Sequence, residues 1–385
     1  MEIIVNTNPD SSSTTVDTPE QNLPEIVATA QPRCDLPDQL AKTSLMAAES
    51  AISPEGRYIV VLEDGASPEM VGQVTAFAKG STMRTFNSVI KGFAGRMSQE
   101  EVEKLRRDPR VRYVEPDYMV KLSSQEQTVV ASGAETEPWG VTEVGGSRDG
   151  NGKVAWIIDT GIDLYNTDLN VDRARSRNFV PDGRADATDH NGHGTHVAGI
   201  IGAKKNGSGV VGVAAGARLV GVRVLNDTGA GYYSSIIAGV DYAAANAKAG
   251  DVINMSLGGE ASRAIDEAVR RAADRGLKVV VAAGNERQST ASVSPARLNY
   301  PGVYTVSAIN ARGSIASFSN YGTAVDAAAP GVDITSTRVG GGLVRMSGTS
   351  MAAPHVTGLL LFGKVHANGY ATFDPDGCAD PLAYR

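Results

Sequence analysis

The 385-residue sequence predicts a doubly wound α/β domain with a mostly parallel sheet, preceded by a small α+β module of ferredoxin-like topology. Two observations predict the large domain: its apolar runs are continuous, as in parallel strands covered on both faces, and helical patterns separate these runs. The small module is predicted by a β-α-β-β-α-β order of patterns near the N-terminus.

The small module is expected over residues 55–122. Ser98 and Glu101 form a capping box that begins its second helix, and Pro109 ends that helix. The module contains no histidine or cysteine, so it suits an interaction or chaperone role better than catalysis. Its expected elements are strand 56–64, helix 67–80, one or two strands in 83–97, helix 98–109 and strand 111–120.

Four other segments complete the expected organisation. Residues 1–54 are rich in Ser, Thr and Pro, and they are expected to be a disordered leader. Residues 123–137 should be an exposed linker, 138–370 the large domain and 371–385 a C-terminal tail of no evident role. The large domain should contain strands at 154–159, 217–225, 251–257 and 277–285, with helices at 195–203, 232–248 and 260–275.

Charge and composition exclude several classes of function. The formal net charge of −7 argues against nucleic-acid binding, which needs a clustered basic face. No apolar run reaches the about 18 residues of a membrane-spanning helix, so we expect no membrane span. Two cysteines, Cys34 and Cys378, are too few for a disulfide framework, and the sequence alone does not argue for a bridge between them. We expect a monomer.

Three histidines, His190, His193 and His196, repeat at a spacing of three. They raise the possibility of a metal site. Against a metal site, no HExxH motif is present, and the helix that follows has to pack its apolar residues on the sheet. Two readings remain from the residues themselves: a metal site, or one catalytic base with structural neighbours.

Three further residues favour the catalytic reading. Asp159 closes the run VAWIID, at the end of a parallel strand where ligands bind in such folds. Ser350, in SGTSMAAPHV, begins a segment of small residues that is expected to be helical. Asp, His and Ser are the three groups that make a hydroxyl nucleophilic, and the side chain of Asn285 could donate to an oxyanion. The alternative interpretations are that Asp159 only makes a turn, that His193 is a structural histidine and that Ser350 is only a helix N-cap.

These motifs resemble the subtilisin-like serine proteases, or subtilases, of the subtilisin and proteinase K branches. The resemblance covers roughly residues 138–365 and keeps the family order Asp, His, Ser. It implies that His193 is the base, Ser350 the nucleophile and Asn285 an oxyanion donor, while His196 and His355 are structural. The matching stretches are VAWIIDTGID, NGHGTHVAGII, INMSLGG, VVVAAGNE and SGTSMAAPHV.

The resemblance also implies how peptide substrates bind. An extended substrate would pair with the edge strand around GAG, and the small walls of the S1 pocket favour apolar P1 side chains. The implied substrate-binding residues are Gly229, Ala230, Gly231, Ser256, Leu257, Gly258, Ala282, Ala283 and Gly284.

Residues 55–122 resemble the inhibitor I9 propeptide of the same family. This resemblance implies an intramolecular chaperone and inhibitor that is removed autocatalytically by a cut within 123–137. The partners are therefore protein or peptide substrates and the chain's own propeptide.

No cofactor is expected for catalysis, but the resemblance implies structural Ca²⁺. One site would use the carbonyls of Pro301 and Val303 with the carboxylate of Asp326, and another would use Asp168 and Asn206. A plain solvated turn is the competing reading for each aspartate.

The function expected is that of a serine endopeptidase made as a zymogen. A pseudoprotease that binds peptides without cutting them would normally lack one of the four site residues, and a metal hydrolase would need the histidine cluster. We expect an extracellular or exported protein, with the cytoplasm as the alternative, although the first residues lack the pattern of a standard signal peptide.

Overall fold

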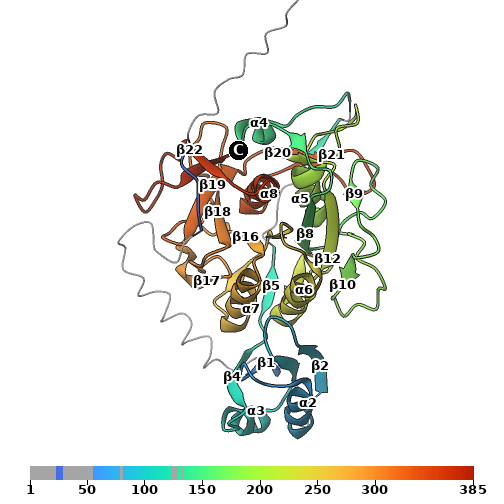
Figure 1. Cartoon of the computed structure of the whole chain (residues 1–385), viewed down its shortest axis with the longest axis vertical. Coiled ribbons are helices and arrows are strands. Elements are labelled where there is room, and N and C mark those ends of the chain that lie inside the picture. Colours follow the sequence, from blue (N-terminus) through green and yellow to red (C-terminus); the bar gives the residue numbers. More distant parts are fainter. Residues whose placement is uncertain (1–22, 29–54, 79–80, 123–127, 132) are drawn as a thin grey trace, which may run out of the picture.

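The computed structural model describes residues 23–28, 55–78, 81–122, 128–131 and 133–385. The remainder of the expected leader, and residues 123–127 and 132 of the expected linker, lie outside the described residues. A small domain and a large domain lie end to end, and one strand runs from the first into the second (Figure 1). No helix in the described part of the chain is long and apolar enough to cross a membrane.

The small domain has the β-α-β-β-α-β order that the sequence predicts. Its antiparallel sheet has the strand order β2-β3-β1-β4. The Ser98 capping box begins α3 as expected, with the Glu101 side chain accepting from the Ser98 N–H. The elements are β1 (Arg57–Leu62), α2 (Pro68–Phe77), β2 (Ser81–Phe86), β3 (Gly92–Arg96), α3 (Gln99–Arg106) and β4 (Val111–Pro116).

The large domain contains a mostly parallel sheet of order β10-β12-β8-β14-β16-β18-β19-β23-β22, with β9 also paired to β12. All neighbours along it are parallel except β22 and β23. The strands are β8 (Val154–Asp159), β9 (Asn170–Val171), β10 (Arg177–Asn178), β12 (Arg218–Arg223), β14 (Val252–Met255), β16 (Lys278–Ala282), β18 (Val303–Ile309), β19 (Val325–Pro330), β22 (His366–Tyr370) and β23 (Pro381–Tyr384).

Helices cover both faces of this sheet, which explains the continuous apolar runs of its strands. One apolar core lies under α5 (His193–Gly202) and α8 (Thr349–Leu360). The other lies under α6 (Tyr233–Asn246) and α7 (Arg263–Asp274) and continues into the sheet of the small domain. The remaining elements are α4 (Trp139–Glu143), β5 (Met119–Lys121), β6 (Thr128–Val130), β7 (Arg148–Asp149), β11 (Ala214–Ala215), β13 (Ala230–Tyr232), β15 (Gly259–Glu260), η1 (Thr290–Ser292), β17 (Val293–Ser294), β20 (Ile334–Thr337) and β21 (Leu343–Met346).

Buried carboxylates join the two domains. Glu115 of β4 accepts hydrogen bonds from the Ser262 hydroxyl and from the Arg263 and Ala264 N–H groups, at the start of α7. Asp117 does the same at the start of α6, where it accepts from the N–H and the hydroxyl of Ser234 at 2.8 and 2.7 Å. Both carboxylates therefore lie where the helix dipole favours negative charge.

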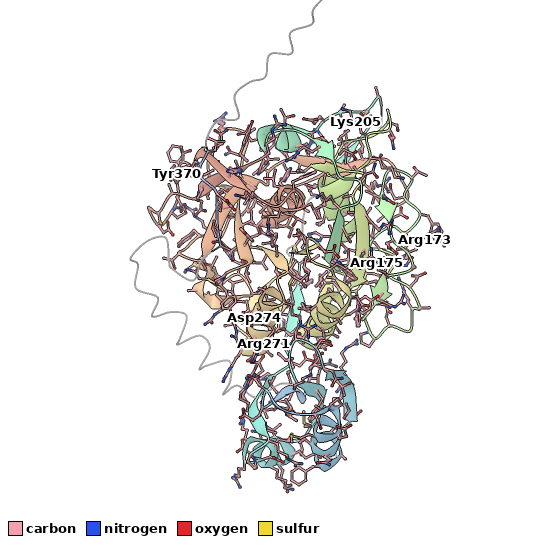
Figure 2. The ribbon with its side chains drawn as sticks, in the orientation of Figure 1. Arg173, Arg175, Lys205, Arg271, Asp274 and Tyr370 are labelled. Atoms are coloured by element: carbon pink, nitrogen blue, oxygen red, sulfur yellow. The ribbon has the colours of Figure 1, made fainter. Side chains whose placement is uncertain are left out.

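An ion pair extends the contact between the domains at its rim. Arg271 on α7 is 2.6 Å from Asp64 of the small domain. Figure 2 shows Arg271 and Asp274 at the end of the large domain that faces the small one.

The structure differs from the expected segment boundaries in three places. Residues 23–28, expected to be disordered, lie against β22. Residues 128–130, expected in an exposed linker, form β6 and pair with β21. The expected tail contains β23, which lies inside the main sheet between β19 and β22. In each place backbone pairing to residues far away in sequence orders a short segment that has no strong pattern of its own.

Candidate active site

His193 and Asp159 form a buried pair at the carboxyl end of the sheet. The Nδ1 atom of His193 lies 2.8 and 3.0 Å from the two carboxylate oxygens of Asp159. Because a carboxylate only accepts, Nδ1–H is the donor, and Nε2 keeps its lone pair. Burial lowers the pKa of His193, but the charge and the hydrogen bond of Asp159 outweigh burial and raise this pKa above its ordinary value of 6.5.

The start of α5 is built to bring His193 close to β8. Asp189 is fully buried and caps this helix, since its carboxylate accepts from the N–H groups of Gly192 and Thr195 at 2.9 Å. A side chain at Gly194 would collide with the carbonyl oxygen of Gly161, so the glycine lets the helix approach the strand end.

Ser350 is the second residue of α8, which packs beside α5. Its hydroxyl donates to the carbonyl oxygen of Ser256 at 3.1 Å, and the Ser256 hydroxyl donates to the carbonyl oxygen of Ser350 at 2.8 Å. The Nε2 atom of His193 is buried and has no hydrogen-bond partner within the described part of the chain. A proton acceptor is therefore free at the same end of the two helices as the serine.

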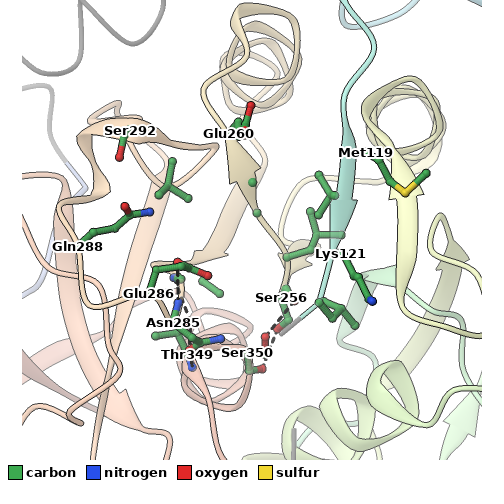
Figure 3. Close-up of a pocket in the computed structure, with 18 residues that line it drawn as sticks. Met119, Lys121, Ser256, Glu260, Asn285, Glu286, Gln288, Ser292, Thr349 and Ser350 are labelled. Carbon is green, nitrogen blue, oxygen red and sulfur yellow. Dashed lines mark hydrogen bonds between the residues drawn. The ribbon is translucent and has the colours of Figure 1, made fainter. Parts of the chain in front are cut away.

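Asn285 follows β16 on the other side of Ser350. Its side-chain oxygen accepts from the N–H and the hydroxyl of Thr349 at 2.8 and 3.0 Å (Figure 3). These two bonds identify the oxygen, so the Nδ2 group is the end of the amide that remains able to donate.

The other histidines do not converge on His193. The Nε2 atom of His196 lies 3.0 Å from the carbonyl oxygen of Ile334, and Nδ1 of His355 lies 2.8 Å from that of Met351. Burial lowers the pKa of His196 to about 3 and that of His355 to about 4, so both are neutral. Across the described ranges no three His, Cys, Asp or Glu side chains form a group that could hold a metal ion.

Strand β5, which follows β4 of the small domain in sequence, lies along β13, the edge strand that was expected to bind substrate. It pairs antiparallel with β13, with Lys121 opposite Ala230 and Val120 opposite Gly231. The N–H of Leu122 continues the ladder to the carbonyl oxygen of Gly229 at 2.9 Å. Strand β5 therefore pairs with the edge strand β13 in the way that an extended peptide substrate would.

A pocket opens beside β5 and reaches Ser350 (Figure 3). Five of the expected wall residues line it, while Ala283 is buried behind the wall and Gly229, Ala230 and Gly231 lie on the β13 edge. Lining residues that were not expected are those of 119–122, together with Glu260, Glu286, Gln288, Ser292, Val293 and Thr349. The expected ones are Ser256, Leu257, Gly258, Ala282 and Gly284.

Asp168 and Asn206 lie together, with Asn206 Nδ2 2.9 Å from Asp168 Oδ1. The sequence reasoning missed Glu135, whose carboxylate accepts from the N–H groups of Asn206 and Gly207 at 2.5 and 2.6 Å. Burial, and to a lesser degree the charge of Glu135, raise the pKa of Asp168. The two carboxylates are donors that fit a hard cation such as Ca²⁺, whereas the amide oxygen of Asn206 accepts from the N–H of Ser208 at 3.1 Å.

At the other expected calcium site, Asp326 is buried beside the strand that begins at Val303. Its Oδ2 atom accepts from the N–H of Thr305 at 2.9 Å. The carboxylate therefore lies against the segment that holds Pro301 and Val303, although one oxygen is already hydrogen-bonded.

The sequence reasoning missed three residues that position the site. They are Asp189, which caps α5; Thr349, which orients Asn285; and Asn254, which donates to the Ser256 hydroxyl at 2.9 Å and accepts from the Thr357 hydroxyl. Only Asp189 had a local signal, as an acidic residue just before a helix start. The other two act across segments far apart in sequence.

The family model for the subtilase family matches residues 150–371, which is more than half of the chain. The chain belongs to the subtilase family. The model for peptidase inhibitor I9 matches residues 57–123, so the small domain is an I9-type propeptide domain and the large domain is the peptidase domain. The chain is a subtilisin-like serine protease, as the sequence predicts.

Curated relatives agree with this assignment. The alkaline serine protease ver112 of Corniculantispora psalliotae is 37% identical, over 83% of this chain and 83% of that protein. The alkaline serine exoprotease A of Vibrio alginolyticus is 39% identical over 84% of this chain, and the chain spans 63% of that protein's length. Proteinase R of Parengyodontium album is 34% identical, over 80% of this chain and 78% of that protein.

A solved structure of a cold-adapted subtilisin-like serine proteinase is 36% identical, with a TM-score of 0.58. The match covers 64% of this chain and 97% of that structure. The expected fold class, an α/β subtilisin-like domain after an I9-type domain, is confirmed.

Proposed function

We propose that this protease is an endopeptidase that uses Asp159, His193 and Ser350 as its catalytic triad and Asn285 in its oxyanion hole. The observation that carries this proposal is the buried Asp159–His193 pair, whose free Nε2 lies at the same end of the fold as Ser350. A buried acceptor without a partner is costly, and a proton-transfer role explains why it is kept.

The proposed reaction follows from these positions. Nε2 of His193 takes the proton of Ser350 as Oγ attacks the carbonyl carbon of the scissile bond. The N–H of Ser350 and the Nδ2 group of Asn285 donate to the oxyanion. The imidazolium, stabilised by Asp159, then protonates the leaving amine as the acyl-enzyme forms. Water repeats the sequence and releases the acid.

The experiment that tests the triad is labelling by a fluorophosphonate, which reacts with an activated serine. We expect one label per mature chain by intact mass, no label in Ser350→Ala, and a strong loss of rate in His193→Ala. Equal labelling of the Ser350→Ala variant would overturn the assignment.

We propose further that the chain is a zymogen that cuts itself between Leu122 and Thr128. In support, Leu122 pairs with the substrate edge of β13, whereas Thr128 already pairs with β21 of the peptidase domain. Apolar residues among those that line the pocket, Leu257, Ala282 and Val293, support a preference for apolar P1 side chains. A series of peptides that differ only at P1 tests this preference.

Two other proposals concern the environment of the enzyme. Asp168, Asn206 and Glu135 are proposed to hold a structural Ca²⁺, with Asp326 and the carbonyls of Pro301 and Val303 as a second site. Export is proposed because Cys378 is disulfide-bonded, and disulfides persist in oxidising compartments. Differential scanning calorimetry with and without Ca²⁺, and fractionation of the producing cells, test these two points.

A further inference from the structure

Residues 23–28 precede the I9-type domain in sequence, yet they lie on the peptidase domain beside β22 (Figure 1). The N–H of Ile26 donates to the carbonyl oxygen of Val365, and the N–H of Ala367 donates to that of Pro24, both at 2.8 Å. Because β22 is the last strand of the main sheet, this segment, which we call the leader strand, covers its free edge.

Polar side chains fix the register of the leader strand. Glu25 forms an ion pair of 2.7 Å with Lys364, and Nδ1 of His366 donates to the carbonyl oxygen of Leu23 at 3.0 Å. These side-chain contacts lie on either side of the two backbone hydrogen bonds. Both kinds of contact are therefore consistent with a single register of the leader strand against β22.

The apolar side chains of the leader strand alternate between core and solvent. Ile26 and Ala28 are each 3% exposed and belong to the apolar core under α5 and α8, whereas Val27 between them is 52% exposed. The backbone of Ala28 also hydrogen-bonds to Tyr304 of β18. Burial of the Ile26 side chain in this core stabilises the docked position, so the leader strand is an integral part of the folded domain.

The connectivity of the chain then has a consequence for maturation, which rests on the proposed self-cleavage. The I9-type domain joins the peptidase domain at both ends, through residues 29–56 to Ala28 and through residues 123–127 to Thr128. We propose that the leader strand stays bound to the mature enzyme. Because Cys378 is disulfide-bonded and the sequence has one other cysteine, Cys34, the I9-type domain is then released only by a second cut between Cys34 and Arg57.

A single cut near residues 123–127 leaves the inhibitor tethered beside the site that it blocks. A covalent tether keeps the effective concentration of the inhibitor there on the order of millimolar, and this concentration does not fall when the enzyme is diluted. The second cut removes the tether and leaves the leader strand as a short separate chain on the sheet edge.

The first experiment tests the docking without using the enzyme's own activity. A Ser350→Ala chain receives recognition sequences for a sequence-specific protease within 29–54 and within 123–127, and both are cut. Size exclusion then separates the pieces, and intact mass identifies them. The run contains reductant, because Cys378 is disulfide-bonded and the sequence has one other cysteine, Cys34.

We expect the N-terminal fragment to elute with the peptidase domain, and at least tenfold less of it to do so in Ile26→Asp. Val27→Asp is the matched control, since it adds the same charge one residue along on the exposed side. Ile26→Ala should show intermediate retention and keeps the test valid if the aspartate variant misfolds. Elution of the fragment apart from the domain in the Ser350→Ala chain itself would overturn the proposal.

The second experiment tests the tether in the active chain, again in reductant. Activity on a small chromogenic peptide is followed beside the intact masses, and samples that carry only the first cut are diluted 100-fold. We expect no relief of inhibition on dilution in wild type or Val27→Asp, and at least tenfold relief in Ile26→Asp. Equal relief in wild type and Ile26→Asp would contradict the tether. Absence of the first cut would instead refute self-cleavage and leave the docking result standing.

Discussion

His193 connects the electrostatics of the site to its proposed chemistry. Its imidazole has to be neutral to accept the proton of Ser350, and Asp159 raises its pKa above 6.5. Below the raised pKa the imidazolium predominates and the base is lost. Activity should therefore fall as the pH drops through a value above 6.5, and it should be full on the alkaline side.

The pH profile of kcat/KM checks this expectation. Asp159→Asn removes the charge that raises the pKa and also favours the wrong tautomer, so kcat should drop on the order of 10⁴-fold. The acidic limb of the residual activity should move to lower pH. An unmoved limb in the variant would show that Asp159 does not set the pKa of His193.

Asn285 is expected to act on turnover more than on binding. Its loss in Asn285→Ala should lower kcat about 10²–10³-fold with little change in KM, a range that comes from subtilisin itself. Thr349→Val should give a smaller loss, because it removes only one of the two bonds that orient the amide oxygen. Steady-state kinetics on one peptide measure both, and a change confined to KM would refute the oxyanion role.

At the level of elements, the starts of α6 and α7 hold the propeptide domain through Asp117 and Glu115. Burial raises the pKa of Glu115 to about 7, while its hydrogen bonds to Ser262, Ala264 and Arg263 work in the opposite direction. The bound proton stabilises the zymogen fully below about pH 4.5, the usual value for this carboxyl, and this stabilisation is lost as the pH rises through 7.

Urea unfolding of the Ser350→Ala zymogen between pH 4.5 and 8 tests this linkage. We expect the free energy of unfolding to fall by roughly 1–3 kcal/mol more over this range than in the same chain with Glu115→Gln, whose amide does not titrate. Glu100→Gln, on the exposed face of α3, is the matched control and should keep the wild-type slope. Identical slopes for Glu115→Gln and the control would contradict the linkage.

The elements also show how much of the fold follows from local sequence. The run 154–159 becomes β8 with the expected bounds, and helix 232–248 becomes α6 at 233–246, because buried strands and amphipathic helices carry their pattern locally. The leader strand and β23 were not expected. Each has about six residues or fewer and depends on backbone partners far away in sequence, which no local pattern encodes.

The same division holds for the site. Asp159, His193 and Ser350 each end a strand or begin a helix, which are positions that a sequence pattern can locate. Thr349 and Glu135 were missed, since their importance comes from the residue they meet across the fold. Pairing of Thr349 with Asn285 and of Glu135 with Asn206 needs the three-dimensional arrangement.

At the level of the whole molecule, the proposed Ca²⁺ site would join three separate segments through Glu135, Asp168 and Asn206. A bound ion neutralises the repulsion between the two carboxylates and stabilises only the folded state. We expect Ca²⁺ to raise the Tm of the mature enzyme by several degrees, and Asp168→Asn to remove most of this increase.

Asp149→Asn serves as the control for that measurement, because it changes an exposed aspartate outside the site. Calorimetry at a series of Ca²⁺ concentrations separates the variants. An unchanged calcium response in Asp168→Asn would exclude this site and leave the one at Asp326 as the remaining candidate.

The measurement that tests the account most directly is the intact mass of the purified chain over time, for wild type beside Ser350→Ala. The account predicts that wild type breaks between Leu122 and Thr128 while the alanine variant keeps its full length, which would assign the cut to Ser350. Full-length mass in both folded proteins, or the same cut in both, would contradict self-cleavage by this site.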